Sequence, residues 1–148
     1  MESENFSGFC NKSLNFALKR ETSNLTHLKK KSVVIGASPR PFRYSYTAVM
    51  ELNRFGHDVT AIGLREEKIG TIPIQTGFPH IEDVDTVTLY IGAKNQPPYY
   101  DYILKQLKPK RLIMNPGAEN NELKALATEK QIDVVENCTL MMLAHGMY

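Results

Sequence analysis

Residues 36–43, which read GASPRPFR, contain the side chains best suited to binding a ligand, and they directly follow the apolar run SVVI. Gly36 permits a tight turn at the end of a strand and removes side-chain bulk near a ligand. Ser38 can add a hydroxyl group, and Arg40 and Arg43 can add positive charge. If a helix begins near Ser45, its free amides and its dipole also favour an anion. The segment therefore predicts a phosphate-binding loop, and the alternative is an ordinary connection whose arginines are solvated.

The kind of phosphate ligand is a separate question. A dinucleotide fingerprint would place its second and third glycines at Ser38 and Pro41, and an acidic residue near the end of the second strand would hold the ribose. That strand ends at Gly63 and is followed by Arg65 and Lys68. These two cations suit an additional phosphate on a ribose, as in NADP or coenzyme A (CoA). A solvated loop of mixed charge is the alternative reading.

These loops need a scaffold, and the pattern of apolar residues predicts one. Short β-branched runs alternate with amphipathic segments, which indicates right-handed βαβ crossovers and a parallel sheet. Ser45 is expected to cap the first helix, and Gly56 to end it. The prediction is a single α/β domain with a doubly wound, Rossmann-like, five-stranded parallel sheet. The predicted strands are residues 32–37, 57–63, 84–92, 110–117 and 132–138, with an extended piece at 71–74, and the helices are 46–55, 97–107, 118–131 and 139–146.

Ligands of such sheets bind beyond the carboxyl ends of the strands, close to the point where the strand order reverses. We therefore expect the site to be formed by the loops that follow the strands. These loops are residues 36–43, 63–70, 92–98, 115–121 and 137–140.

The composition is that of a globular protein, with 42% hydrophobic and 23% charged residues among 148. The net charge of +2 resides in residues 1–30, so residues 31–148 are neutral and nucleic acid is not the expected partner. No apolar run is long enough to span a membrane. Residues 1–30 lack the apolar core of a secretory signal, and we expect a disordered extension before a domain at 31–148. The expected location is the cytoplasm, where a disulfide between Cys10 and Cys138 is not expected.

Several segments occur in an order and spacing that resemble the stand-alone CoA-binding proteins of bacteria. These proteins are in turn similar to the N-terminal CoA-binding domain of the succinyl-CoA synthetase α subunit. The resemblance covers about residues 31–142 and implies a Rossmann-like fold that binds CoA or an acyl-CoA. The segments are VVIGASPRPFRYSYTAVMEL, GTIPI, VDTVTLYI, NPGAENNE and VVENCTL.

The resemblance also implies where each part of CoA would lie. The pyrophosphate would face residues 36–43, and the adenosine with its 3′-phosphate would lie near residues 63–68. Relatives usually have Asn-Pro after the second strand, whereas this chain has Gly63 and Leu64. Residues 91–100 would run beside the adenine or the pantetheine. The implied binding residues are Gly36, Ala37, Ser38, Pro39, Arg40, Arg43, Ser45, Gly63, Arg65, Lys68, Asn115, Gly117 and Cys138.

No pair of residues predicts catalysis or a metal site. His27, His57, His80 and His145 are expected to be surface or turn residues, and no cluster has the spacing of metal ligands. Cys138 is expected at the carboxyl end of a strand, where it either packs as a buried cysteine or exchanges with the CoA thiol. The sequence thus predicts a binding protein for a small nucleotide ligand. An NADP-dependent oxidoreductase and a regulatory subunit of a separately encoded acyl-CoA ligase remain as alternatives.

Overall fold

The strand β1 (Lys31–Ala37) lies at the centre of the sheet in the computed structural model, which describes residues 29–148. Val33, Val34 and Ile35 are fully buried, because helices cover both faces of this strand. β1 pairs in parallel with β2 (Asp58–Gly63) on one side and with β5 (Thr86–Leu89) on the other. The strand order therefore reverses at β1, whose carboxyl end is where a doubly wound sheet binds its ligands.

The sheet has seven strands, so the expected number of five is wrong. The additional pair is β3 (Lys68–Ile69) and β4 (Ile72–Gln75), which form an antiparallel hairpin. The segment expected to be merely extended at 71–74 is thus a true strand, which pairs in parallel with β2. β6 (Arg111–Met114) and β7 (Asp133–Glu136) continue the parallel sheet beyond β5, and the order is β3-β4-β2-β1-β5-β6-β7.

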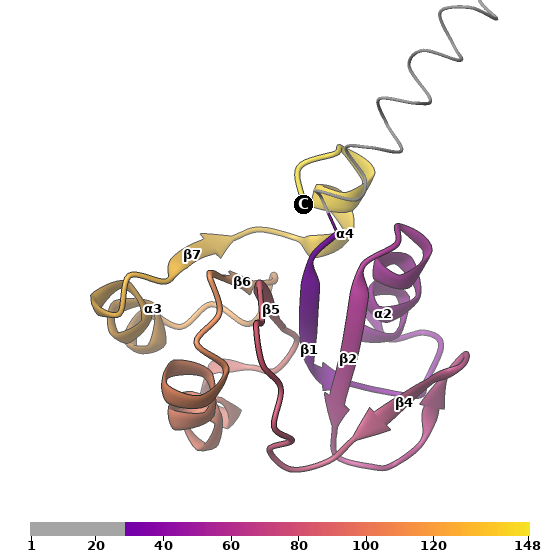
Figure 1. Ribbon diagram of the computed structural model, residues 1–148, viewed down its shortest axis with the longest axis horizontal. Coiled ribbons are helices and arrows are strands. Elements are labelled where there is room, and N and C mark those ends of the chain that lie inside the picture. The colour runs from indigo at the N-terminus through magenta and orange to yellow at the C-terminus, as the bar shows by residue number, and fades with distance from the viewer. Residues whose placement is uncertain (1–28) are drawn as a thin grey trace, which may run out of the picture.

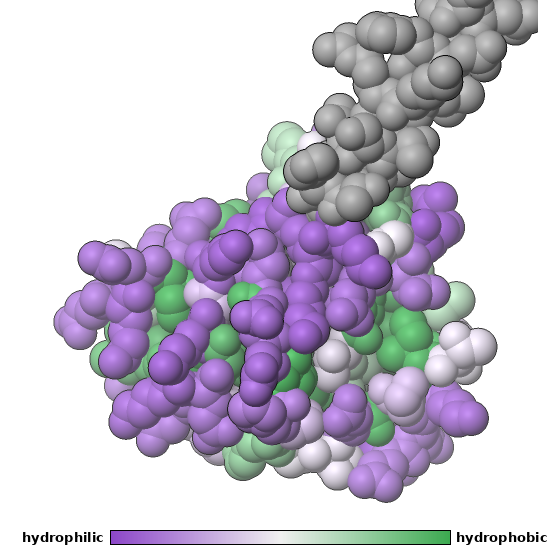
Figure 2. Space-filling model, in the orientation of Figure 1, coloured by the Kyte–Doolittle hydropathy of each residue, from purple (hydrophilic) through white to green (hydrophobic). Residues whose placement is uncertain are grey.

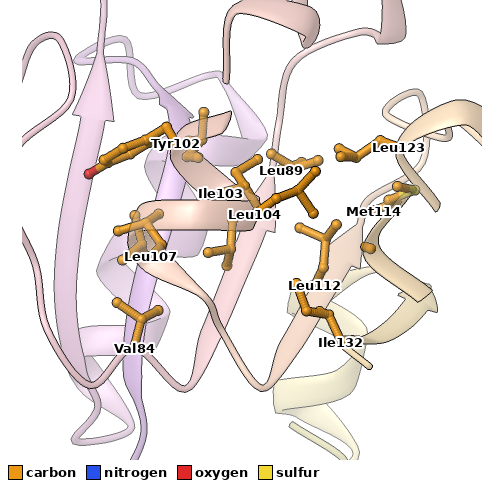
Figure 3. Packing of buried hydrophobic residues seen from close by; sticks show 14 of the residues in the cluster. Val84, Leu89, Tyr102, Ile103, Leu104, Leu107, Leu112, Met114, Leu123 and Ile132 are labelled. Carbon is orange, nitrogen blue, oxygen red and sulfur yellow. The ribbon is translucent and has the colours of Figure 1, made fainter. Parts of the chain in front are cut away.

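Two layers of helices enclose the sheet (Figure 1). The helices α2 (Tyr44–Arg54) and α4 (Thr139–Ala144) contribute Val49, Leu52 and Leu143 to a buried cluster with Val34. On the other face, α3 (Asn121–Glu129) and the helical segment η3 (Tyr102–Leu107) pack on Val33 and Ile35. Figure 3 shows part of this second cluster, in which side chains of η3 meet residues of β5, β6 and α3.

Ser45 does not cap α2, which corrects the expectation. The helix begins at Tyr44 after Arg43, whose backbone is extended and whose side chain makes no capping hydrogen bond. The carbonyl of Arg43 accepts from the N–H of Tyr46 and of Thr47. Ser45 therefore lies in the first turn of the helix, where it is buried.

The helix expected at 97–107 is present but is not a regular α-helix, since it begins as a 3-10 turn at the two prolines and continues as a π-helix. η1 (Ala93–Asn95) and η2 (Pro97–Tyr99) are 3-10 turns, and η3 has the wider turn of a π-helix. Lys108 ends η3 in the left-handed conformation and donates its N–H to the carbonyl of Ile103. α3 begins three residues later than expected, at Asn121, because the side chain of Asn120 caps it.

No helix connects β4 to β5, although the alternating pattern predicts helical crossovers. Residues 76–85 cross instead as an irregular segment, which buries Val84 in the same core cluster as η3 and places Ile81 beside that cluster. The predictions made for residues 1–28, including Cys10 and His27, lie outside the described residues. Within residues 29–148, no helix is long and apolar enough to cross a membrane.

Candidate functional site

Glycines near the carboxyl ends of β1 and β2 let neighbouring chain segments approach closely. Gly36 in β1 lies against Ile91 after β5, and Gly63 at the end of β2 lies against Ala37 of β1. Gly36 has φ +99, and an added Cβ would lie 2.8 Å from Cγ2 of Ile91. An added Cβ on Gly63 would lie only 2.3 Å from the carbonyl oxygen of Ala37. These glycines therefore permit contact between neighbouring strands, and the loops after Ala37 and Gly63 begin side by side.

The loop between β1 and α2 presents hydrogen-bond donors at its far end. Ser38 accepts an N–H from Arg40 at 3.3 Å, which tightens the turn. Because Arg43 makes no side-chain cap, the amides of Tyr44 and Ser45 at the start of α2 have no acceptor among the described residues. Arg40 and Arg43 are exposed, whereas Ala37 is buried and Pro39 is half-buried. The loop thus combines free amides, a helix dipole and two cations, which suits an anion.

The loop after β2 carries two further cations. Arg65 and Lys68 are exposed, and neither forms an ion pair with another residue in the described part of the chain. The carboxylate of Glu66, in the same loop, accepts the hydroxyl of Thr76 at 3.3 Å. Leu64, between these cations and the sheet, is 90% exposed.

Asn115, directly after β6, is buried and hydrogen-bonds to neighbouring elements. Its side-chain amide donates to the hydroxyl of Thr88 at 2.7 Å and to the carbonyl of Leu89 at 2.8 Å. Its side-chain oxygen accepts the N–H of Thr139 at 2.8 Å. With 2% of its surface exposed, the side chain fastens β5, β6 and α4 together. A direct contact of Asn115 with a ligand stays a prediction.

Gly117 and Cys138 lie on loops at this same edge. Gly117 has φ +94, and its N–H donates to the carboxylate of Glu119 at 2.8 Å. Cys138 immediately precedes α4 and is half-buried, and its N–H donates to the side chain of Asn137 at 2.7 Å. No histidine in the described region hydrogen-bonds Cys138, so nothing here supplies a base to its thiol.

Sequence reasoning missed Tyr90, which follows β5. Its hydroxyl is buried beside Thr88 and Thr139 but forms no hydrogen bond with any described residue, and burial raises the pKa of Tyr90 well above its usual value. Gln96 was missed as well. It is fully buried, and its side-chain amide donates to the carbonyls of Ile91 and Ala118, which joins two loops of the candidate site. Neither residue has a flanking motif that would have signalled its role.

None of the described histidines is hydrogen-bonded to a serine, threonine or cysteine side chain. His57 accepts the N–H of Lys30 at 3.1 Å, at the amino edge of the sheet. His80 is exposed and pairs with Glu82 at 2.9 Å, and His145 is also exposed. Between residues 29 and 148, no three His, Cys, Asp or Glu side chains are grouped so that they could hold a metal ion.

Comparison with known proteins identifies the family of this chain. Residues 30–144 match the family described as CoA binding domain. An uncharacterized protein of known crystal structure is 44% identical, with a TM-score of 0.78 over 81% of this chain and 98% of the other. A search of curated proteins finds no significant match.

Two more distant structures share the fold. A hypothetical protein from Pyrococcus horikoshii OT3 is 22% identical, with a TM-score of 0.72 over 86% of this chain and 90% of that one. A protein from Thermus thermophilus is 16% identical, with a TM-score of 0.70 over 88% of this chain and 98% of the other. Because the family match spans most of the chain and the closely similar structure covers the same domain, the chain belongs to the CoA-binding domain family.

Proposed function

We propose that the chain binds CoA or an acyl-CoA at the carboxyl edge of the sheet, without catalytic machinery of its own. The observation that carries this proposal is the start of α2, where uncapped amides follow the glycine turn of β1, together with two exposed arginines that form no ion pair with any described residue. A diphosphate is the part of CoA that fits such a loop, because it accepts several hydrogen bonds and carries negative charge. Ser38 would add its hydroxyl group to the same cradle.

The neighbouring loop would hold the adenosine side of the ligand. Arg65 and Lys68 supply positive charge for the 3′-phosphate, and Gly63 keeps this loop against β1. Leu64 and Phe42, which are 90% and 77% exposed, offer apolar surface on the two loops. These side chains would contact the adenine or the pantetheine arm. Among the described residues, no nucleophile is paired with a base, which supports binding without catalysis.

Calorimetry with CoA tests the proposal on the protein and on Arg40→Ala. Loss of a charge-assisted contact is expected to weaken CoA binding about tenfold. Arg54→Ala is the matched control, since Arg54 is also exposed but pairs with Glu51 on the far end of α2. Equal affinity of Arg40→Ala and the unmodified protein would contradict the proposed diphosphate site.

A thermal-shift screen with CoA, acetyl-CoA, NADP and NAD distinguishes the ligand class. A ligand that binds only the folded state raises the melting temperature. The proposal expects an increase with CoA or acetyl-CoA and none with the dinucleotides. A larger increase with NADP would favour an oxidoreductase, and no increase with any of them would refute the proposal.

A further inference from the structure

A groove of about 490 Å³ lies at the edge of the sheet opposite the candidate CoA site. It is formed by the two chain segments that lead into β6 and β7, at the amino ends of these strands. Its lining residues are Leu104, Lys105, Lys108, Pro109, Lys130 and Ile132. Since the CoA loops follow the carboxyl ends of the strands, this groove is a separate feature.

The groove has an apolar floor. Leu104 and Ile132 are both 7% exposed and belong to the core cluster on the η3 side of the sheet. Figure 3 shows these two side chains in that cluster, where Leu104 comes from η3 and Ile132 precedes β7. Pro109 completes the apolar lining.

The rim of the groove is positively charged. Lys105, Lys108 and Lys130 are all exposed, and none of the six lining residues is acidic. Lys105 pairs with Asp101 at 3.2 Å. Within residues 29–148, no carboxylate forms an ion pair with Lys108 or Lys130. Two ammonium groups therefore remain for an anion over the apolar floor.

The backbone that forms this rim adopts an uncommon conformation. Lys108 has φ 45, and Gln131, directly after Lys130, has φ 64. Glycine is the usual residue where a helix ends in the left-handed region, because a Cβ is unfavourable there. The chain instead has side-chain-bearing residues at both turns beside the groove, and Lys108 itself supplies one of the two available ammonium groups.

We propose that this groove binds a small aliphatic carboxylate. Its volume lies within the range of about 300–1,000 Å³ that is typical of small-ligand sites. An aliphatic chain fits the floor of Leu104, Pro109 and Ile132. A carboxylate group fits Lys108 and Lys130, whose flexible stems carry compact charges.

Methyl-resolved NMR of the full chain, titrated with decanoate, tests this site directly. Saturable shifts of the Ile132 and Leu104 methyl signals are expected, because the aliphatic chain would contact both side chains. Decyltrimethylammonium, which has the same chain and the opposite charge, is the ligand control and is expected to leave these signals unchanged. Absence of a saturable shift with decanoate, or an equal shift with the cationic amphiphile, would overturn the proposal.

Charge-reversed variants test the role of the rim. Lys108→Glu and Lys130→Glu together are expected to weaken decanoate binding about tenfold or more. Lys94→Glu, an exposed lysine on η1, makes the same kind of charge change far from the groove and is expected to leave decanoate binding unaltered. CoA affinity of the double variant is expected to match that of the unmodified protein, which separates this inference from the proposed function. Unaltered decanoate affinity in the double variant would contradict the carboxylate assignment.

Discussion

The side-chain oxygen of Asn115 accepts the backbone N–H of Thr139 at 2.8 Å, and this single hydrogen bond joins the end of β6 to the start of α4. The same side chain donates to β5, so three elements meet at one buried amide. Cys138 directly precedes Thr139, so this hydrogen bond also holds the backbone next to Cys138. Asn115 thereby holds β5, β6 and α4 together below the loops of the candidate site.

Replacing Asn115 by alanine is expected to destabilise the protein by about 2–3 kcal/mol, because buried partners such as the Thr139 N–H would lose their acceptor or donor. Urea denaturation measures this change. Asn53→Ala, on the exposed face of α2, is the control and is expected to alter stability by less than about 0.5 kcal/mol. If Asn115→Ala kept full stability but lost CoA affinity, Asn115 would be a direct ligand contact instead.

Gly63→Ala is expected to cost about 2–3 kcal/mol, since the new Cβ would collide with backbone that cannot move aside easily. Its position would be 2.3 Å from the Ala37 carbonyl oxygen and 2.9 Å from Cγ2 of Ile74. Gly92→Ala is the matched control, because its Cβ would meet nothing closer than 4.0 Å. Equal urea midpoints for the two variants would show that β1 and β2 do not need this close approach.

Acidification is expected to reduce stability through His57. Burial, followed by the charges of Lys30 and Arg111, lowers the pKa of His57 below its ordinary 6.5, although Asp85 opposes the shift. The ring also packs at a tilt against Tyr148, with ring centroids 4.9 Å apart, and Nδ1 accepts the Lys30 N–H. Between the folded pKa and 6.5, the unfolded chain binds a proton that the folded chain does not, so the free energy of unfolding falls as the pH decreases.

Urea denaturation across this pH window checks the effect. Below the pKa of His57 in the folded protein, the free energy of unfolding stops falling, because both states then bind the proton. Above pH 6.5 neither state binds it, so His57 no longer reduces the stability. His57→Gln is expected to flatten the slope, whereas His145→Gln, at an exposed position, is expected to retain it. Glu51 and Glu82 titrate below this pH window, because their neighbours lower the pKa of both carboxylates below 4.5. An unchanged slope in His57→Gln would contradict this origin.

The sequence predicts the central fold well where local pattern and burial agree. The run SVVI is apolar on both sides, and it is indeed the strand that is covered by helices on both faces. Prediction fails where two rules conflict. A helix is expected at 97–107, but the segment is a 3-10 turn followed by a π-helix. The two-residue strand β3 is too short to show any periodicity.

Only part of the candidate site could be predicted from the sequence. Gly36, Arg40 and Arg43 lie close together in the sequence, so their common loop could be expected. The roles of Asn115 and Gln96 depend on partners 20 or more residues away, such as Thr139 for Asn115 and Ala118 for Gln96. Sequence spacing carries no record of such contacts. The surface over this fold is mostly hydrophilic on the face shown in Figure 2, which gives no separate indication of the site.

Arg65 and Lys68 lead to the last prediction, which concerns ligand specificity and rests on the proposed function. CoA differs from dephospho-CoA only by the 3′-phosphate, so the proposed contact predicts weaker binding of dephospho-CoA by about tenfold. Calorimetry with both ligands measures the difference. In Arg65→Ala combined with Lys68→Ala, CoA affinity is expected to fall to that of dephospho-CoA, whose own affinity stays constant, because the variant has lost only the phosphate partner. Arg54→Ala is expected to preserve the discrimination. Equal affinities of the unmodified protein for the two ligands would exclude this phosphate assignment while leaving the diphosphate loop to be judged by Arg40→Ala.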